Sequence, residues 1–186
     1  MTELFYDHAG IDGARMHFPQ SLARRLTAQQ VQAHLQRDLG PQEGQRFASQ
    51  LASKFPDGFN CWGIPTGGER VFNLLDAGDI VLLIGKIQVQ PYPDGLFEYA
   101  ATVQVKYPDP LHWTSQHVWG EARWPLMFFF GATKIALPWP TFLKDTGYLT
   151  TWNPQGMFYR VNPKRYGNLP GGDPDLYLQH IVKHYP

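Results

Sequence analysis

The sequence predicts an α+β fold in which helices precede a curled or barrel-like β-sheet. Apolar residues recur at helical spacing through residues 21–55. Two β-rich runs follow, at 79–89 and 97–107, with a turn of prolines and a glycine between them. The later β-rich runs are of unequal length, and helices followed by such strands are typical of this fold class.

Residues 1–57 are expected to form an N-terminal arm and helices that pack on the core. Residues 1–20 contain two glycines and a proline, so they are predicted to be an irregular arm. Residues 21–39 are predicted to be helical, with Thr27 as a candidate N-cap. A second helix is expected to begin at Pro41, because proline is favoured in the first turn.

Residues 58–186 are expected to form the core and a basic C-terminal tail. The run 79–89 is rich in β-branched residues, and 97–107 alternates between apolar and polar positions, so the two predict a β-hairpin. The apolar run 124–130 predicts another buried strand. Shorter elements are expected at 134–137 (a strand that pairs with 124–130), 140–146 (a helical turn), 157–161 (a strand) and 176–183 (a helix).

Charge and cysteine content narrow the class of protein. Sixteen basic residues balance 16 acidic ones, so the chain as a whole does not attract nucleic acid or membranes. The single cysteine, Cys61, fits a reducing compartment, and no signal peptide or membrane helix is recognisable, so a cytoplasmic protein is expected. Aromatic residues reach 15%, which suits either a recognition surface or a β-rich core.

Motifs for catalysis are missing from the sequence. It contains no phosphate-binding loop and no Gly-x-Ser-x-Gly elbow. His112 and His117 lack an obvious third ligand, and no basic environment surrounds the thiol of Cys61. The chain is therefore expected to need no metal or cofactor and not to be an enzyme by itself.

Two of the six tryptophans occupy positions that suggest binding. Trp62 lies between Asn60 and a Gly-Ile-Pro turn, where its face is expected to be open. Trp113 lies in a polar segment predicted to be a loop. An exposed apolar ring is unusual there and suggests a binding role. Trp119 and Trp152 fit a core position better, and so do the two that remain, Trp124 and Trp139.

The order of these segments resembles that of the EVE and YTH families of the PUA-like superfamily. Residues 60–65 (NCWGIP) resemble the YTH segment that supplies one wall of a methyl-base cage. Residues 78–82 (GDIVL) resemble the start of a strand in EVE domains, and 111–113 (LHW) resemble the loop with the second cage tryptophan. The resemblance covers about 58–165, and the helical region 21–55 departs from the family core.

The resemblance implies a domain that flips a modified base of double-stranded DNA into an aromatic cage. The base would be a methylated or hydroxymethylated cytosine or N6-methyladenine. Cage walls would be Trp62 and Trp113, with Asn60 at the rim, and Cys61 and Trp119 complete the predicted base-binding set. Such a domain would give specificity to a modification-dependent restriction system whose nuclease or NTPase is another domain or subunit.

Phosphate contacts are expected from the basic C-terminal part. From residue 123 onward seven basic and three acidic residues leave a charge of 7 − 3 = +4. Lys164 and Arg165 form a compact basic loop, and Arg160 precedes it, so these three are the predicted backbone clamp. An ordinary solvated loop is the alternative.

Three other functions stay open. A methylated-RNA reader would use the same cage and would differ in its response to the 2′-hydroxyl. A protein-interaction domain would keep its tryptophans mostly in the core. A hydrolase that uses Cys61 or a histidine pair is the least supported by the residues.

Overall fold

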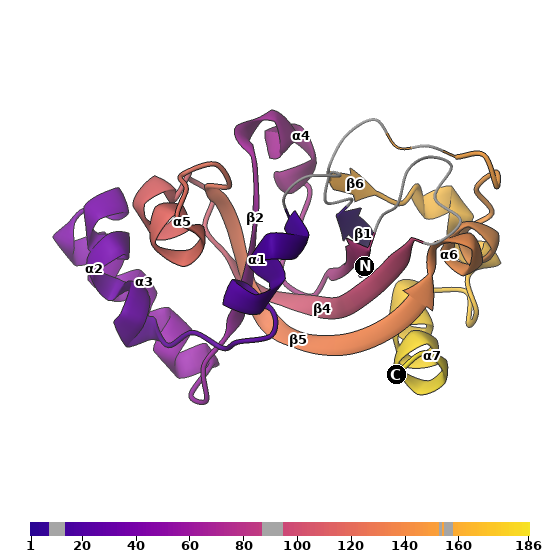
Figure 1. Ribbon diagram of the computed structural model, residues 1–186, viewed down its shortest axis with the longest axis horizontal. Coiled ribbons are helices and arrows are strands. Elements are labelled where there is room, and N and C mark those ends of the chain that lie inside the picture. The colour runs from indigo at the N-terminus through magenta and orange to yellow at the C-terminus, as the bar shows by residue number, and fades with distance from the viewer. Residues whose placement is uncertain (8–13, 87–94, 153, 155–157) are drawn as a thin grey trace. The chain divides into compact units, whose positions relative to one another are not determined.

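The computed structural model describes residues 1–7, 14–86, 95–152, 154 and 158–186, and it has the predicted fold class, α+β. Six strands form one sheet in the order β2-β5-β4-β3-β1-β6 (Figure 1). The strands are β1 Leu4–Asp7, β2 Asn60–Ile64, β3 Ile80–Lys86, β4 Leu96–Lys106, β5 Leu126–Pro138 and β6 Phe158–Arg160.

The described residues also form seven α-helices and two 3-10 helices. The α-helices are α1 Ala14–Ser21, α2 Ala28–Leu39, α3 Pro41–Lys54, α4 Glu69–Phe72, α5 His112–Trp119, α6 Trp139–Thr146 and α7 Pro174–His184. The 3-10 helices are η1 Thr66–Gly68 and η2 Pro163–Asn168. None of the helices in the described parts of the chain has both the length and the apolar character needed to cross a membrane.

The chain folds into two compact units. Unit 1 consists of residues 1–16, 78–102 and 132–186, and unit 2 consists of 17–77 and 103–131. Strands β4 and β5 each begin in one unit and end in the other. The predicted division into 1–57 and 58–186 stays a prediction.

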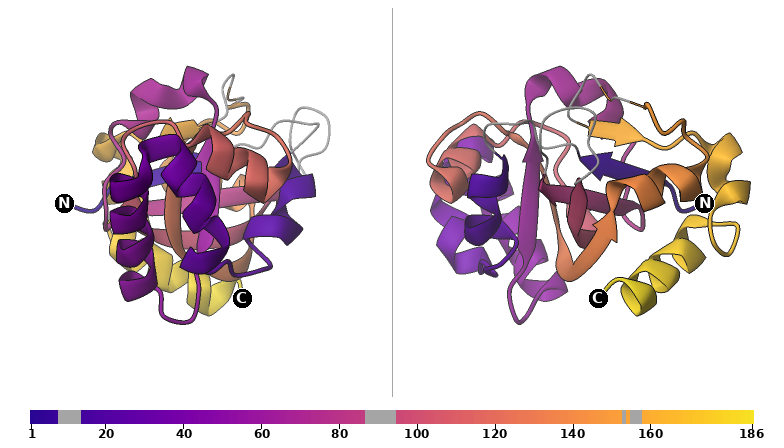
Figure 2. Two further views of the ribbon diagram at one scale, coloured as in Figure 1. Left: turned by 90° about the vertical axis from the view of Figure 1, so that its left-hand side faces the viewer. Right: turned by 45° about the vertical axis from the view of Figure 1, so that its right-hand side comes forward.

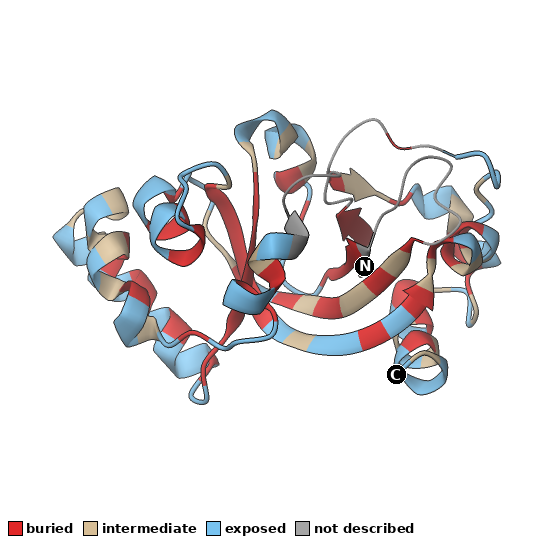
Figure 3. Ribbon diagram, in the orientation of Figure 1, coloured by how far each residue is buried: buried red, intermediate tan, exposed pale blue. Residues whose placement is uncertain are grey.

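Unit 1 is built around the centre of the sheet. Strand β1 pairs in parallel with β3, from Leu4 beside Ile80 to Asp7 beside Leu83, and β6 pairs antiparallel with β1 on its other side. Strand β3 pairs antiparallel with β4, which confirms the predicted hairpin pairing, although residues 91–94 of its predicted turn lie outside the described residues. Side chains from β1, β3, β4, β5, α6, η2 and α7 form one buried hydrophobic cluster. Figure 3 shows the buried residues of the ribbon in red.

Unit 2 contains the two helices that the sequence predicts best. Thr27 begins α2 with a capping box, because its hydroxyl accepts from the amide of Gln30 while its own amide donates to the Gln30 side chain. Pro41 is the first residue of α3, as predicted. The two helices lie side by side (Figure 2), and Phe47 of α3 packs edge-on against Phe129 of β5.

Three predictions of local structure are wrong. The N-terminal arm is not irregular, because residues 4–7 form β1, a buried strand inside the sheet, and 14–21 form α1. Residues 124–130 and 134–137 do not form two paired strands, since they belong to the single long strand β5. The segment around Trp113 is not a loop: it is α5, which ends at Gly120 in a left-handed conformation with φ 79°.

Candidate functional site

Tryptophans of unit 2 gather in an indole cluster made of Trp62, Trp119, Trp124, Phe18 and His17. The ring centroids of Trp62 and Trp119 are 6.1 Å apart, as are those of Trp119 and Trp124, and both pairs meet edge to face. Phe18 meets Trp62 at 5.2 Å, and His17 meets Trp124 at 4.4 Å. Because Trp62 is only 4% exposed, the prediction that its face is open is wrong.

Strand β2 can carry this cluster because Gly63 follows Trp62. A Cβ at Gly63 would lie 2.8 Å from two ring carbons of Trp119 and would overlap the carbonyl oxygen of Trp124. The indoles therefore pack directly on the backbone of the strand, and any larger residue would push them away.

Gly63→Ala is expected to destabilise the protein by about 1–3 kcal/mol, because overpacking beside a backbone carbonyl forces the strand or the indoles to shift. Urea unfolding followed by circular dichroism measures this loss. Gly131→Ala is the matched control, since Gly131 also lies in a strand and a Cβ added there would meet no atom within 4 Å. Equal stability of the two variants would contradict the packing described.

Asn60 does not lie at the rim of a pocket. It is 3% exposed, and its side-chain amide donates to the carbonyl oxygens of Ser21 at 3.1 Å, Leu22 at 2.9 Å and Arg24 at 3.2 Å. The indole of Trp119 donates to the Ser21 hydroxyl at 3.1 Å. These bonds hold the end of α1 against the cluster, so Asn60 positions the backbone here.

Cys61 lies in the same strand and is fully buried beside Phe129 of β5. Burial raises the pKa of the Cys61 thiol, which disfavours the nucleophilic thiolate. The interpretation as a small buried thiol is therefore confirmed.

Iodoacetamide at pH 8 should leave Cys61 unmodified in the folded protein and should alkylate it fully in guanidinium, because only unfolding exposes the sulfur. Mass spectrometry of the intact chain reads the difference. Rapid alkylation of the folded protein would instead support the hypothesis of a hydrolase that uses the Cys61 thiol.

Trp113 is not a member of the indole cluster and lies in the first turn of α5 of unit 2. The Asp38 carboxylate accepts from the backbone amides of Trp113 and Thr114, both at 2.9 Å, and caps this helix from α2. The Arg37 guanidinium carbon lies 3.1 Å from the ring centroid, and Trp113 remains 38% exposed. The structure thus gives Trp62 and Trp113 different neighbours instead of placing them as facing walls.

The predicted phosphate-binding residues lie in unit 1, and two of them are already engaged. Arg160 forms two hydrogen bonds with Glu3, at 2.6 and 3.0 Å, and the Tyr166 hydroxyl donates to the same carboxylate at 2.6 Å. Burial works to raise the pKa of Glu3, but the bonds from Arg160 and Tyr166 outweigh it and lower the pKa. Arg165 donates to the carbonyl of Gly147, whereas Lys164 is exposed.

Unit 1 also holds a tyrosine–tryptophan stack made of Tyr6, Tyr148, Trp152 and Tyr159. The rings of Tyr148 and Trp152 are 5.1 Å apart with an interplanar angle of 11°, and those of Tyr6 and Tyr159 are 5.1 Å apart at 13°. The indole of Trp152 donates to the Tyr6 hydroxyl at 3.1 Å, which joins the two pairs. The guanidinium carbon of Arg165 lies 4.3 Å from the Tyr148 ring centroid.

Exposure separates this stack from the indole cluster. Trp152 is 37% exposed, although its indole N–H bonds to the Tyr6 hydroxyl and one of its faces stacks on Tyr148. By contrast, Trp62 and Trp119 are each 4% exposed. Sequence reasoning placed Trp152 in the core and did not identify the tyrosines. The polar residues beside Trp152, which resemble those beside Trp113, were the signal available.

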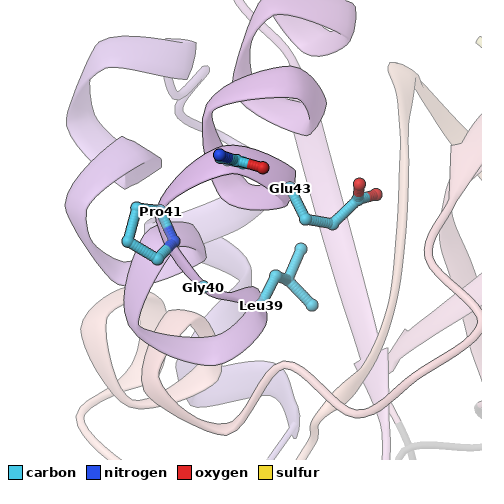
Figure 4. Close-up of a pocket in the computed structure, with 5 residues that line it drawn as sticks. Leu39, Gly40, Pro41 and Glu43 are labelled. Atoms are coloured by element: carbon cyan, nitrogen blue, oxygen red, sulfur yellow. The ribbon is translucent and has the colours of Figure 1, made fainter.

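A surface pocket of about 420 Å³ lies at the turn between α2 and α3 (Figure 4). Its one carboxylate, Glu43, accepts from Arg46 at 2.7 Å and from the Tyr107 hydroxyl at 3.1 Å. The lining comes from one stretch of five consecutive residues, Leu39, Gly40, Pro41, Gln42 and Glu43. The described residues contain no group of three or more potential metal ligands, at this pocket or elsewhere.

Comparison with known proteins shows the fold. No family model matches the chain, and no curated protein does. The structure is similar to a solved one described as the N-terminal domain of Thermococcus gammatolerans McrB bound to m5C DNA, with a TM-score of 0.61 and 16% sequence identity. The match covers 90% of this chain and 94% of that one. The likeness is one of fold, and the predicted α+β class is confirmed.

Proposed function

We propose that this chain binds double-stranded DNA and recognises a modified base, as a PUA-like reader of the EVE or YTH type. The observation that carries the proposal is the partly exposed indole of Trp152, which the tyrosine–tryptophan stack holds in one orientation. The chain shares its fold with a domain described as bound to m5C DNA, and this supports DNA with a modified base as the ligand.

The energetics of base reading suit a stack of this kind. Taking a base out of the duplex costs a few kcal/mol, and stacking on an aromatic ring returns about 1–3 kcal/mol per base. Trp152 does not have to be ordered on binding, because Tyr148 and the Tyr6 hydroxyl already hold its ring. We therefore infer that the flipped base stacks on Trp152.

Phosphate contacts in this proposal come from Lys164. It is exposed and follows Asn162, whose side chain accepts from the Lys164 amide at 3.0 Å and begins η2. Arg160 and Arg165 stay in the predicted set. Each of them would have to contact a phosphate in addition to its present protein partner. Any cleavage of the DNA belongs, in this proposal, to a nuclease or NTPase domain or subunit.

The base-binding role of Trp62, Trp113, Asn60, Cys61 and Trp119 remains a prediction. For Trp62 and Trp119 to contact a base, the indole cluster would have to open, since both rings are buried. A conservative change, Trp62→Phe, tests the predicted cage because it keeps the cluster apolar. Lost discrimination in that variant, with Trp152→Ala unaffected, would move the site to the indole cluster.

A binding panel tests the function itself. Duplexes that each carry one 5-methylcytosine, 5-hydroxymethylcytosine or N6-methyladenine are compared with the plain duplex at one stated salt concentration. One modified duplex should bind at least about tenfold more tightly than plain DNA, which corresponds to about 1.4 kcal/mol. Matched RNA strands serve as competitors, and preference for RNA would favour the methylated-RNA reader. Equal binding of every duplex would contradict the proposal.

A further inference from the structure

Helices α2 and α5 of unit 2 meet through two ring contacts in which Arg37, Trp113 and His117 are exposed and His34 is half-buried. The imidazoles of His34 and His117 stack with centroids 4.0 Å apart and an angle of 17°. One turn along, the guanidinium of Arg37 covers the ring of Trp113. We call these four residues the histidine–arginine ladder.

The ladder presents Arg37 and the histidine pair beside one carboxylate, that of Asp38. Arg37 and His117 are exposed, and His112 is exposed at the start of α5. The one acidic residue of α2 is Asp38, whose two carboxylate oxygens accept three hydrogen bonds from Trp113 and Thr114 of α5. Helix α5 has no acidic residue.

Helix α3, which packs on α2, adds no unpaired acid to this surface. Its one acidic residue, Glu43, bonds to Arg46 and to the Tyr107 hydroxyl. Its side-chain hydrogen bonds to α2 come from Gln45, which accepts from Gln32 and Gln36. The charges that face the ladder are therefore those of α2 and α5.

Stacked imidazoles respond to protons in a distinctive way. Two neutral rings pack well, but two imidazolium ions 4.0 Å apart repel each other. Burial and the neighbouring His34 lower the pKa of His117, so the unbound pair resists a second proton. An anion against the pair would remove that resistance, because it attracts both charges.

We propose that the histidine–arginine ladder is a phosphate-binding site that takes up a proton when it binds a DNA phosphodiester. The choice of DNA as the source of the phosphate rests on the proposed function. Arg37 supplies the permanent charge and the histidine pair the pH-dependent one. Since the complex holds more protons than the free components, affinity falls as pH rises.

Fluorescence anisotropy of a labelled duplex with one 5-methylcytosine, at fixed salt from pH 5 to 8, tests the proposal. Binding should weaken about tenfold over this range, because one histidine proton with a reference pKa near 6.5 is taken up. His34→Gln and His117→Gln should each flatten the profile. Arg37→Gln should weaken modified and plain duplexes equally and lower the salt slope by about one.

Unit 1 offers a matched control in the stacked pair His180 and His184, whose rings are 4.3 Å apart. The Asp145 carboxylate interacts electrostatically with His180, so this pair should attract a phosphate less than the ladder does. His180→Gln is expected to keep the pH profile of the unchanged protein. A flat profile in the unchanged protein, or one that survives both ladder substitutions, would overturn the proposal.

A second arm separates this proposal from the proposed function. Proton NMR of the histidine C2 signals is recorded with and without inorganic pyrophosphate. The pKa of His117 should rise with pyrophosphate, and the C2 signals of His180 and His184 should not respond to it. If the pKa of His117 rises but no modified duplex is preferred, the phosphate site is supported and base reading is refuted. No rise at the ladder would refute the ladder alone.

Discussion

Trp152→Ala is expected to weaken binding of the preferred modified duplex by about 5- to 150-fold, which corresponds to the 1–3 kcal/mol of one base–aromatic stack. Binding of the plain duplex should change little, because its bases stay in the helix. The expected result is therefore a loss of discrimination more than a loss of affinity. Anisotropy titrations with both duplexes at one salt concentration measure the ratio.

Two variants make this measurement specific. Trp113→Ala removes an indole of almost equal exposure, 38% against 37%, from the histidine–arginine ladder, so it should weaken both duplexes equally and leave their ratio unchanged. Trp152→Phe keeps an aromatic ring but loses the bond to the Tyr6 hydroxyl, and it should retain part of the discrimination. A folded Trp152→Ala protein that discriminates normally would refute the assignment of Trp152.

Asn60→Ala should be the most destabilising of these substitutions, at about 2–4 kcal/mol. The substitution leaves the carbonyl oxygens of Ser21, Leu22 and Arg24 without the amide that they share, and an unsatisfied buried group costs about 1–3 kcal/mol. For a chain of this size, the melting temperature should fall by about 4–16 °C. Differential scanning calorimetry measures the shift.

Asn162→Ala is the matched control for this effect. Asn162 is exposed, and its side chain makes a single bond to the Lys164 amide, so its loss should cost about 1 kcal/mol. If Asn60→Ala melts no lower than Asn162→Ala, Asn60 does not hold α1 in place. In that case its predicted role at the rim of a base pocket would regain support.

Several elements could be predicted because their signals are local. Thr27 and Pro41 mark helix starts through the chemistry of the first turn, and both begin helices as predicted. Gly147 ends α6 with φ 64°, a conformation that favours glycine. The alternation through 97–107 identified β4, and its antiparallel partner β3 was predicted from the neighbouring run.

Other elements depend on partners that are distant in the sequence. Strand β1 is short and gains its place by pairing with β3, about 76 residues along, as the bond from the Glu3 amide to Asp79 illustrates. Helix α5 begins where Asp38 of α2 accepts its first amides, and its own sequence offers no capping side chain. Neither partner is visible in a local pattern.

The sequence by itself determined the α+β class, the main helices and hairpin, and the aromatic character of the chain, because propensity, capping and periodicity act over a few residues. Tertiary structure decided which aromatic rings are accessible. It buried Trp62 under Phe18 and Trp119, placed Arg37 against the ring of Trp113 while leaving that ring 38% exposed, and left Trp152 37% exposed on a stack. Exposure is a property of neighbours brought together by folding, and linear spacing does not encode it.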